Sequence, residues 1–170
     1  MNKYFKSAYL FGILGGVLGL ISFFVLSFFK EDPTTLNLIF GYVIVPISVY
    51  LALKYFKDYS NQGYLSFAEG MSVGFVTYML IAIISFLGIW VLLSLEPDLF
   101  EIIKSSKINT LAESKETIVS QVGENSFLAT MESVKNMVIS DVAINDAIWK
   151  IVPGLFFTII ISIILRKNPN

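Results

Sequence analysis

Residues 70–95 read GMSVGFVTYMLIAIISFLGIWVLLSL, an unbroken run of 26 residues without a charged side chain. A helix needs about 20 mostly apolar residues to cross the hydrocarbon layer of a bilayer, which is about 30 Å thick. Two more uncharged runs meet this requirement, residues 7–29 with 23 residues and residues 33–53 with 21 residues. The three runs therefore predict three membrane-spanning helices.

A fourth span is predicted over residues 147–165, although a charge interrupts it. Residues 151–165 are uncharged but number only 15, and the extension back to residue 147 brings Lys150 inside the span. A lysine near a helix end can lay its stem along apolar surface and carry its ammonium group to the membrane boundary. Trp149 is of a residue type enriched at that boundary. We therefore expect Lys150 to reach outward to the membrane surface.

The composition agrees with a membrane location. Hydrophobic residues make up 55% of the 170 residues, the mean hydropathy is +0.74, and only 15% of the residues are charged. Soluble domains carry about 25% charged residues, and a chain this short could hardly bury so much apolar surface in a core of its own. Barrel strands would read as alternating segments of about ten residues, and no such segments are present. The predicted fold class is therefore all-α: a polytopic membrane protein with four transmembrane helices, forming one membrane domain over residues 1–170.

The first run is predicted to remain in the protein as an anchor. Lys3 and Lys6, followed by an apolar run, are similar to the start of a secretory signal peptide. A signal peptide has an apolar core of about 7–15 residues that ends in a small-residue cleavage site. Residues 7–29 exceed that length and end in Leu26-Ser27-Phe28-Phe29, without such a site.

Basic residues near the span ends predict the orientation, because cytoplasmic loops carry an excess of lysine and arginine. With four spans, one side of the membrane holds both termini and the loop between the second and third spans. The basic residues on that side are Lys3, Lys6, Lys54, Lys57, Arg166 and Lys167. The other side has only Lys30 and Lys150 close to span ends. We therefore expect both termini in the cytoplasm and the long segment before the fourth span on the outer face.

Residues 96–146 are predicted to form a helical segment outside the membrane. They carry nine acidic residues and four lysines, and apolar residues recur among them at helical spacing. Gly123-Glu124-Asn125 is a predicted break, and Ser126 is a candidate N-cap for a second helix. The apolar positions of the two helices are Leu99, Ile102, Ile103, Ile108 and Leu111, then Phe127, Met131, Val134, Val138 and Val142. We expect two amphipathic helices on the membrane surface or against the bundle; the alternative is a solvated helical hairpin without a ligand.

Small residues repeat along one face of the first span and one face of the third. The glycines on these faces are Gly12, Gly15, Gly16 and Gly19 in the first span and Gly70 and Gly74 in the third. A helix face without side chains lets another helix approach closely. We predict that the two spans pack on each other through these faces, within one chain or between chains. The alternative is that the glycines only reflect the higher frequency of glycine in membrane helices.

The loop between the second and third spans has the most distinctive sequence. Asn61-Gln62-Gly63 predicts a turn. Ser66 precedes Glu69 by three residues, which is the spacing of a capping box: the serine hydroxyl accepts from the N–H of Glu69, and the carboxylate accepts from the N–H of Ser66. On this interpretation Glu69 begins a helix. The alternative interpretation is a proton or cation site at the mouth of the third span.

This loop also carries a family resemblance. Its motif residues are Gly63, Tyr64, Ser66, Phe67 and Glu69, followed by Gly70 and Gly74. Together with the glycine-rich first span, the long segment before the fourth span and the basic end of that span, they resemble the domain of unknown function 4199 family, small membrane proteins found mainly in Bacteroidota. The resemblance covers nearly the whole chain. It implies a four-span protein of a bacterial inner membrane, and it implies no particular chemistry.

The sequence lacks the residues of most catalytic sites. It has no cysteine and no histidine, which excludes thiol catalysis, thiolate metal sites and the commonest general base. The acidic residues of the 96–146 segment are spread out without metal-ligand spacing. We therefore expect no catalytic residues, no metal and no cofactor. A net charge of −1 without a basic patch also argues against nucleic acid as a partner.

Three functions remain, in order of preference. The first is a non-enzymatic scaffold or accessory subunit, whose partners are the lipid bilayer and either a second copy of the chain or another membrane protein. The second is a component of an oligomeric transporter or channel, ranked lower because no charged residue is expected in the middle of a span. The third is a membrane enzyme, for which the necessary residues are missing.

The four-span topology can be tested with two reporters. A reporter fused after Asn170 is expected in the cytoplasm, and a reporter inserted near Glu124 is expected on the outer face, because one span separates the two positions. A reporter active only outside and a fluorescent protein that matures only inside would measure this. Finding both positions on the same side would rule out four spans.

Overall fold

The computed structural model describes residues 2–29 and 32–168. These residues form seven α-helices and a short π-helix, η1, which continues α2 from Phe56 to Ser60. The α-helices are α1 (Lys3–Ser27), α2 (Thr34–Tyr55), α3 (Phe67–Leu95), α4 (Pro97–Glu113), α5 (Lys115–Val122), α6 (Glu124–Lys135) and α7 (Ile139–Leu165). The described residues contain no β-strand, and an isolated bridge joins Leu65 to Lys167.

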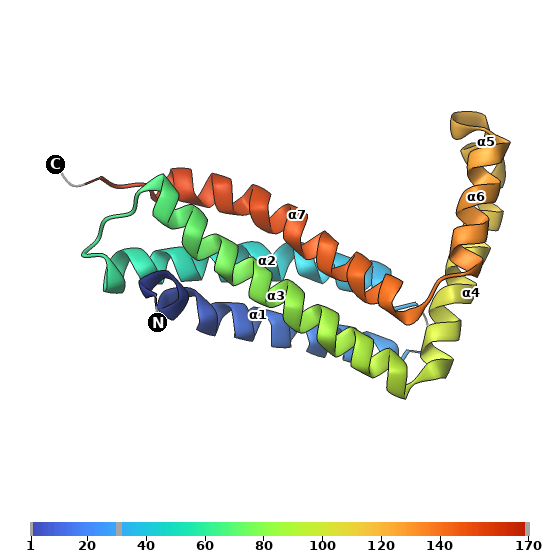
Figure 1. The fold of residues 1–170 in the computed structure, drawn as a ribbon, viewed down its shortest axis with the longest axis horizontal. Coiled ribbons are helices and arrows are strands. Elements are labelled where there is room, and N and C mark those ends of the chain that lie inside the picture. Colours follow the sequence, from blue (N-terminus) through green and yellow to red (C-terminus); the bar gives the residue numbers. More distant parts are fainter. Residues whose placement is uncertain (1, 30–31, 169–170) are drawn as a thin grey trace.

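Four of these helices form an antiparallel bundle, which confirms the predicted all-α fold class. α1, α2, α3 and α7 are each long and apolar enough to cross a membrane. They lie side by side and alternate in direction, so that both ends of the chain lie at the same end of the bundle (Figure 1). We call this the turn end, because it carries the loop of residues 61–66, and we call the opposite end the hairpin end. α3 lies at the centre of the packing and has its most extensive contacts with α7 and α1.

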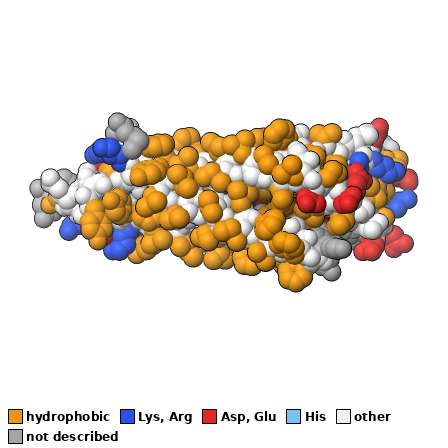
Figure 2. Space-filling model, turned by 90° about the horizontal axis from the view of Figure 1, so that it is seen from below, with side chains coloured by type: hydrophobic (Ala, Val, Ile, Leu, Met, Phe, Trp, Pro, Cys, Tyr) orange, Lys and Arg blue, Asp and Glu red, His pale blue; other side chains and the backbone are white. Residues whose placement is uncertain are grey.

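Apolar side chains cover the face of the bundle seen in Figure 2 along its length. On this face, lysine and arginine side chains gather at the turn end, and several acidic side chains gather at the hairpin end together with further lysines (Figure 2). A continuous exposed apolar surface of this kind is an aggregation hazard in water. Lipid tails cover it in a bilayer, which explains why the exposed charged side chains lie near the two ends.

α7 begins at Ile139, eight residues before the predicted start of the fourth span at residue 147. The predicted span began directly after Asp146, because charged side chains are costly in lipid. Asp146 and Lys150 do not face lipid, however, since their carboxylate and ammonium groups form an ion pair of 2.6 Å within the bundle. The prediction that Lys150 reaches outward is therefore wrong: its side chain is only 3% exposed.

Three helices, not two, form the segment outside the bundle. Ser114 separates α4 from α5, and Gly123, with a φ of +85°, separates α5 from α6. The break predicted at Gly123 is confirmed, and its positive φ suits a residue without a Cβ. α6 returns along α4, so the three helices form a hairpin that lies across one end of the bundle and extends beyond it (Figure 1).

The two ends of α6 differ from the prediction. α6 begins at Glu124, so Ser126 lies in its first turn and is not its cap. It ends at Lys135, so Val138 and Val142 belong to the start of α7 instead of the apolar face of α6. The helical spacing of apolar residues continues across this boundary, which is why the sequence pattern did not reveal it.

Two clusters of buried apolar residues hold the helices together. The cluster nearer the turn end is built mainly from α2 and α3 and includes Val45, Val49, Leu53, Val73 and Ile81. The cluster at the hairpin end joins α1, α3 and α7 to α4 and includes Phe23, Ile89, Leu93, Leu99, Ile103 and Val142. The second cluster fixes the root of the hairpin to the bundle.

α1 and α3 pack on each other, but not through two small faces. A Cβ atom on Gly12 would lie 2.8 Å from Leu80 Cβ and 3.0 Å from the carbonyl oxygen of Thr77, both in α3. Gly16 also faces a large side chain of α3, Ile84, and Gly15 faces Ile81 of α3 together with Ser48 of α2. The small face of α1 thus packs against bulky residues of α3. The two helices approach closely because small residues on one lie opposite large residues on the other.

The glycines at the start of α3 contact a different helix. Gly70 faces Ser162 and Gly74 faces Thr158, and both partners belong to α7. The predicted pairing of these two glycines with the first span is therefore corrected. Sequence spacing shows which residues share a helix face, but it does not show which neighbour that face meets.

Gly12→Ala is expected to lower the free energy of unfolding by about 1–3 kcal/mol, because the added methyl group would press against a backbone oxygen that has no room to move. Ile13→Ala is the control, since Ile13 is 41% exposed on the lipid-facing side of the same helix. Unfolding of the purified protein in detergent measures both variants. Equal stability of the two would show that the close approach at Gly12 is absent.

Candidate functional site

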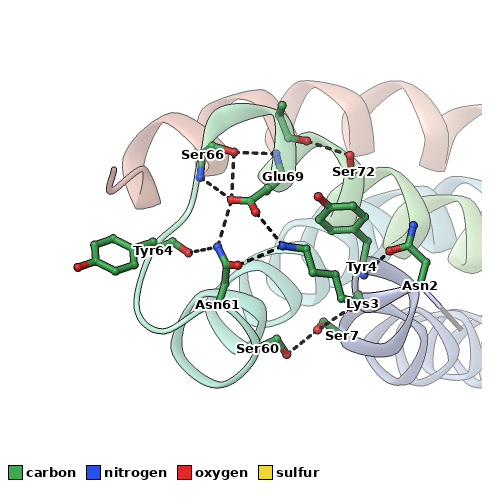
Figure 3. Close-up of polar contacts among 11 residues, drawn as sticks. Asn2, Lys3, Tyr4, Ser7, Ser60, Asn61, Tyr64, Ser66, Glu69 and Ser72 are labelled. Atoms are coloured by element: carbon green, nitrogen blue, oxygen red, sulfur yellow. Dashed lines mark hydrogen bonds and ion pairs between the residues drawn. The ribbon is translucent and has the colours of Figure 1, made fainter. Parts of the chain in front are cut away.

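The loop at the turn end folds around Glu69 (Figure 3). The predicted capping box is confirmed: Ser66 Oγ accepts from the Glu69 N–H at 3.3 Å, and Glu69 Oε2 accepts from the Ser66 N–H at 3.0 Å. Glu69 Oε2 also accepts from Asn61 Nδ2 at 3.1 Å, and Oε1 accepts from Lys3 Nζ at 3.1 Å. The carboxylate thus joins the start of α3 to the loop and to the start of α1.

The other motif residues of the loop extend this joint. Gly63 has a φ of +83°, which suits a glycine in a tight turn. Tyr64 points away from the hydrogen-bond network (Figure 3). Leu65 exchanges two backbone hydrogen bonds with Lys167, each of 2.9 Å, and Phe67 begins α3. The loop therefore ties together α1, α3 and the end of the chain.

A second polar network lies inside the bundle, near the hairpin end. Asp146 of α7 accepts from Asn37 Nδ2 of α2 at 2.9 Å and from Ser85 Oγ of α3 at 2.7 Å. Its third donor is Lys150 Nζ, one turn further along α7, at 2.6 Å. Ser22 of α1 donates to Asn37 Oδ1 at 2.6 Å. Each of the four spanning helices therefore contributes to this inner network, which consists of Ser22, Asn37, Ser85, Asp146 and Lys150.

The inner network lies at membrane depth. Counted back from Leu165, where α7 ends, Asp146 is residue 20, and about 20 helical residues cross the hydrocarbon layer. Asp146 thus lies near the membrane boundary on the hairpin side, and Lys150 lies about 6 Å deeper, at 1.5 Å per residue. Their side chains are 11% and 3% exposed, respectively. Charges at such depth are costly unless they are paired and hydrogen-bonded, and each group supplies that pairing to the other.

Two glycines lie beside the lysine stem. A Cβ atom on Gly19 of α1 would lie 3.7 Å from Lys150 Cε, and one on Gly41 of α2 would lie 3.9 Å from Lys150 Cγ. The lysine stem therefore runs beside α1 and α2 where neither helix carries a side chain. Within the part of the chain that the structure describes, its ammonium group has one hydrogen-bond partner, Asp146, although an ammonium group has three donors.

A cavity of about 430 Å³ between the hairpin and the bundle reaches this network. Its walls come from α2, α4, α6 and α7, and Asp146 is one of its lining residues. Lys107 of α4 also lines it, donates to Thr34 Oγ1 at 3.1 Å and pairs with Asp32 at 3.7 Å. The hairpin thus forms one side of a space that ends at a buried carboxylate.

The sequence analysis did not identify the inner network. It placed Lys150 inside the fourth span but expected its ammonium group at the membrane surface, and it left Asp146 just outside the span, whereas the two side chains pair inside the bundle. The sequence did contain two signals of this network. The first is the pair of Asp146 and Lys150, because opposite charges four residues apart lie on the same face of a helix. The second is Asn37, a polar residue inside the second uncharged run.

The chemistry of the inner network is limited to proton transfer and hydrogen bonding. It contains one carboxylate and one ammonium group, with two hydroxyls and one amide around them. Among residues 2–29 and 32–168 there is no group of three or more histidine, cysteine, aspartate or glutamate side chains that could hold a metal ion. A carboxylate and an amine can exchange a proton with each other or with water.

Comparison with known proteins identifies one family. A family model described as "Protein of unknown function (DUF4199)" matches residues 10–167. The matched range contains the whole inner network, the hairpin and the loop motif. No curated protein and no solved structure matches the chain.

Removal of one charge from the inner network should destabilise the protein more than removal of both. Lys150→Met leaves Asp146 without its counter-charge and is expected to lower the free energy of unfolding by about 3–5 kcal/mol. The double variant Lys150→Met with Asp146→Asn should regain part of this loss, because no ion then lacks a partner.

Lys54→Met is the matched control, since Lys54 forms an exposed pair with Asp58 at 3.0 Å and should contribute little. Unfolding in detergent measures all three variants. A double variant that is less stable than Lys150→Met alone would show that the two side chains do not form a pair inside the bundle.

Proposed function

The chain belongs to the DUF4199 family of proteins of unknown function, and from this premise we propose that it is a non-enzymatic scaffold or accessory subunit of a bacterial inner membrane. The four spanning helices anchor it, both termini lie in the cytoplasm, and the hairpin lies on the outer face. The orientation is supported by the basic residues gathered at the turn end, because such residues favour the cytoplasmic side. The hairpin is the part that contacts a partner.

The proposal rests on the hairpin, whose root is packed against the bundle and whose tip exposes apolar side chains. Leu99 and Ile103 of α4 are buried in the apolar cluster at the hairpin end. Further out, Val122 at the end of α5 and Leu128 of α6 are 58% and 54% exposed. Amphipathic helices with uncovered apolar positions are a common means of docking into a groove of another protein. A rigid base with such a tip suits an accessory subunit.

Photo-crosslinking tests whether the hairpin contacts a protein. A photoreactive amino acid at Leu128 is expected to give a discrete protein adduct in native membranes. The same amino acid at Leu14, which is 51% exposed on α1, should give lipid adducts only. The masses of the products, determined by gel and mass spectrometry, distinguish these results, and an adduct of twice the chain mass would identify a second copy as the partner. Lipid adducts alone from both positions would refute the proposal.

The inner network favours a second candidate, a component of an oligomeric transporter or channel. Ionisable residues inside spans are expensive and commonly mark ion or proton pathways. Asp146 and Lys150 are such residues, and the cavity under the hairpin leads to one of them. Proton or ion flux in proteoliposomes that is lost in Asp146→Asn, while a hairpin variant such as Leu128→Ser keeps it, would favour this role over that of a scaffold.

A further inference from the structure

We propose that the cavity of about 430 Å³ between the hairpin and the bundle, which we call the corner cavity, holds the headgroup of one phospholipid. The headgroup carries both a phosphate and a primary amine, as that of phosphatidylethanolamine does. This inference goes beyond the scaffold role and does not depend on it, because the lipid binds whether or not the hairpin contacts a protein.

The position of the hairpin makes lipid the molecule nearest to the corner cavity. The four spanning helices cross the bilayer along the bundle, whereas the hairpin runs across that direction, past α7 and beyond the bundle (Figure 1). The part beyond the bundle therefore lies over lipid headgroups. The corner cavity lies where this overhang meets the bundle, since its walls run from Lys107 and Ser133 of the hairpin to Thr34 and Leu38 of α2.

Two aromatic side chains mark the depth of the membrane boundary beside this cavity. Tyr42 follows the lining residue Leu38 by four residues on α2. Trp149 follows the lining residue Asn145 by four residues on α7. Residues four apart share a helix face, so each ring lies one turn deeper than the cavity wall, and the two residues are 39% and 44% exposed. Tyrosine and tryptophan are enriched at the level of the headgroups, which places a headgroup in the corner cavity and its chains beside the two rings.

The size and the apolar part of the cavity suit the top of a lipid. Small-molecule sites have volumes of about 300–1,000 Å³, and the corner cavity lies within this range. Leu38, Met137 and Val142 form the apolar part of its lining. They provide a surface for the glycerol backbone and the first methylene groups, while the polar lining residues remain for the headgroup.

One side of the cavity can bind the phosphate. Lys107 donates to Thr34 Oγ1 at 3.1 Å and pairs with Asp32 at 3.7 Å. An ammonium group has three donors, so a phosphate oxygen can accept the third. Asn145 is exposed on the α7 side of the same cavity, and its amide can donate to a second phosphate oxygen.

The other side can bind the amine. Asp141 lines the cavity, and its Oδ2 accepts from the backbone N–H of Val138 at 2.8 Å. Over residues 2–29 and 32–168, its carboxylate forms no ion pair with a lysine or arginine. A primary ammonium group can donate to the remaining acceptor positions of this carboxylate. The lysine and the carboxylate thus match the opposite charges of one zwitterionic headgroup.

Other common phospholipids fit this lining less well. The quaternary ammonium group of phosphatidylcholine has no N–H to donate to Asp141. Phosphatidylglycerol carries a net negative charge, and the cavity offers it two carboxylates, those of Asp141 and Asp146, beside one lysine that already pairs with Asp32. Like charges in proximity disfavour binding, so the lining selects a headgroup that is neutral overall and carries N–H donors.

A photoreactive phosphatidylethanolamine tests the site on the unaltered chain in nanodiscs of phosphatidylcholine. With the photoreactive group on the first carbons of one acyl chain, mass spectrometry should locate adducts at residues 38–42 of α2. Unlabelled phosphatidylethanolamine should displace them about fivefold more effectively than phosphatidylcholine or phosphatidylglycerol does, the factor contributed by one partly exposed charge-assisted hydrogen bond.

Ile21 of α1 is the internal control, because it is 51% exposed and lies at a similar depth from the hairpin end. The three lipids should compete equally for adducts at this position. Equal competition at residues 38–42, or the same preference at Ile21, would overturn the proposal.

Asp141→Asn tests the role of the carboxylate, since an asparagine oxygen can still accept from the Val138 N–H and cap α7. This variant should lose the preference for phosphatidylethanolamine over phosphatidylcholine at residues 38–42. Glu132→Gln is the matched control, because it removes a carboxylate of α6 that does not line the cavity. A preference that survives in Asp141→Asn, or that is lost in Glu132→Gln, would refute recognition of the amine by Asp141.

A second variant keeps the proposal testable if Asp141→Asn does not fold. Asn145 is exposed, so Asn145→Ala should leave the bundle intact. Because Asn145 contacts the phosphate, which both lipids share, the variant should weaken adduct formation at residues 38–42 and keep the ratio between the two competitors. Adduct formation as strong as in the unaltered chain would show that the headgroup does not occupy the corner cavity.

Discussion

The bundle depends on one constraint: Asp146 and Lys150 lie at membrane depth, so each must remain paired with the other. The Asp146 carboxylate accepts hydrogen bonds from side chains of α2, α3 and α7, and Asn37 in turn accepts one from Ser22 of α1. Apolar packing between helices is weakly specific in lipid, because lipid tails are as apolar as the side chains they replace. A polar network shared by four helices supplies what that packing lacks, namely one arrangement in which the two charges are paired and the polar side chains are hydrogen-bonded to one another. The glycines beside the lysine stem belong to the same arrangement.

The same end of the bundle carries the hairpin, and the two features are physically connected. Residues of α4 and α6 form one side of the cavity, and Asp146 lies at another. Lys107 holds α4 to Asp32 and Thr34 at the start of α2. The hairpin and Asp146 of the buried pair thus line one and the same cavity. The turn end, by contrast, is tied down by the capping box of α3, by Lys3 and by the bridge to Lys167.

Features of single helices could be predicted from the sequence, whereas contacts between neighbouring helices could not. Three uncharged runs were sufficient to locate three spans, and the spacing of Ser66 and Glu69 was sufficient to predict the capping box. The outward reach of Lys150 was wrong because a charge was expected to avoid the interior of the bundle, whereas Asp146 and Lys150 neutralise each other there. The partners of Gly70 and Gly74 were wrong for a related reason: helical periodicity reveals a face, but the helix opposite that face is set by tertiary packing.

The central claim is that Lys150 and Asp146 form a contact inside the membrane-embedded bundle. Solid-state NMR on the protein in lipid bilayers, labelled with ¹⁵N at the lysine side chains and with ¹³C at the aspartate carboxyl groups, measures this contact directly. The structure predicts a strong dipolar contact that disappears in Lys150→Met, as expected for a nitrogen and an oxygen 2.6 Å apart. A lysine-to-aspartate spectrum that Lys150→Met leaves unchanged, with the Lys150 ammonium group in rapid exchange with water, would contradict it.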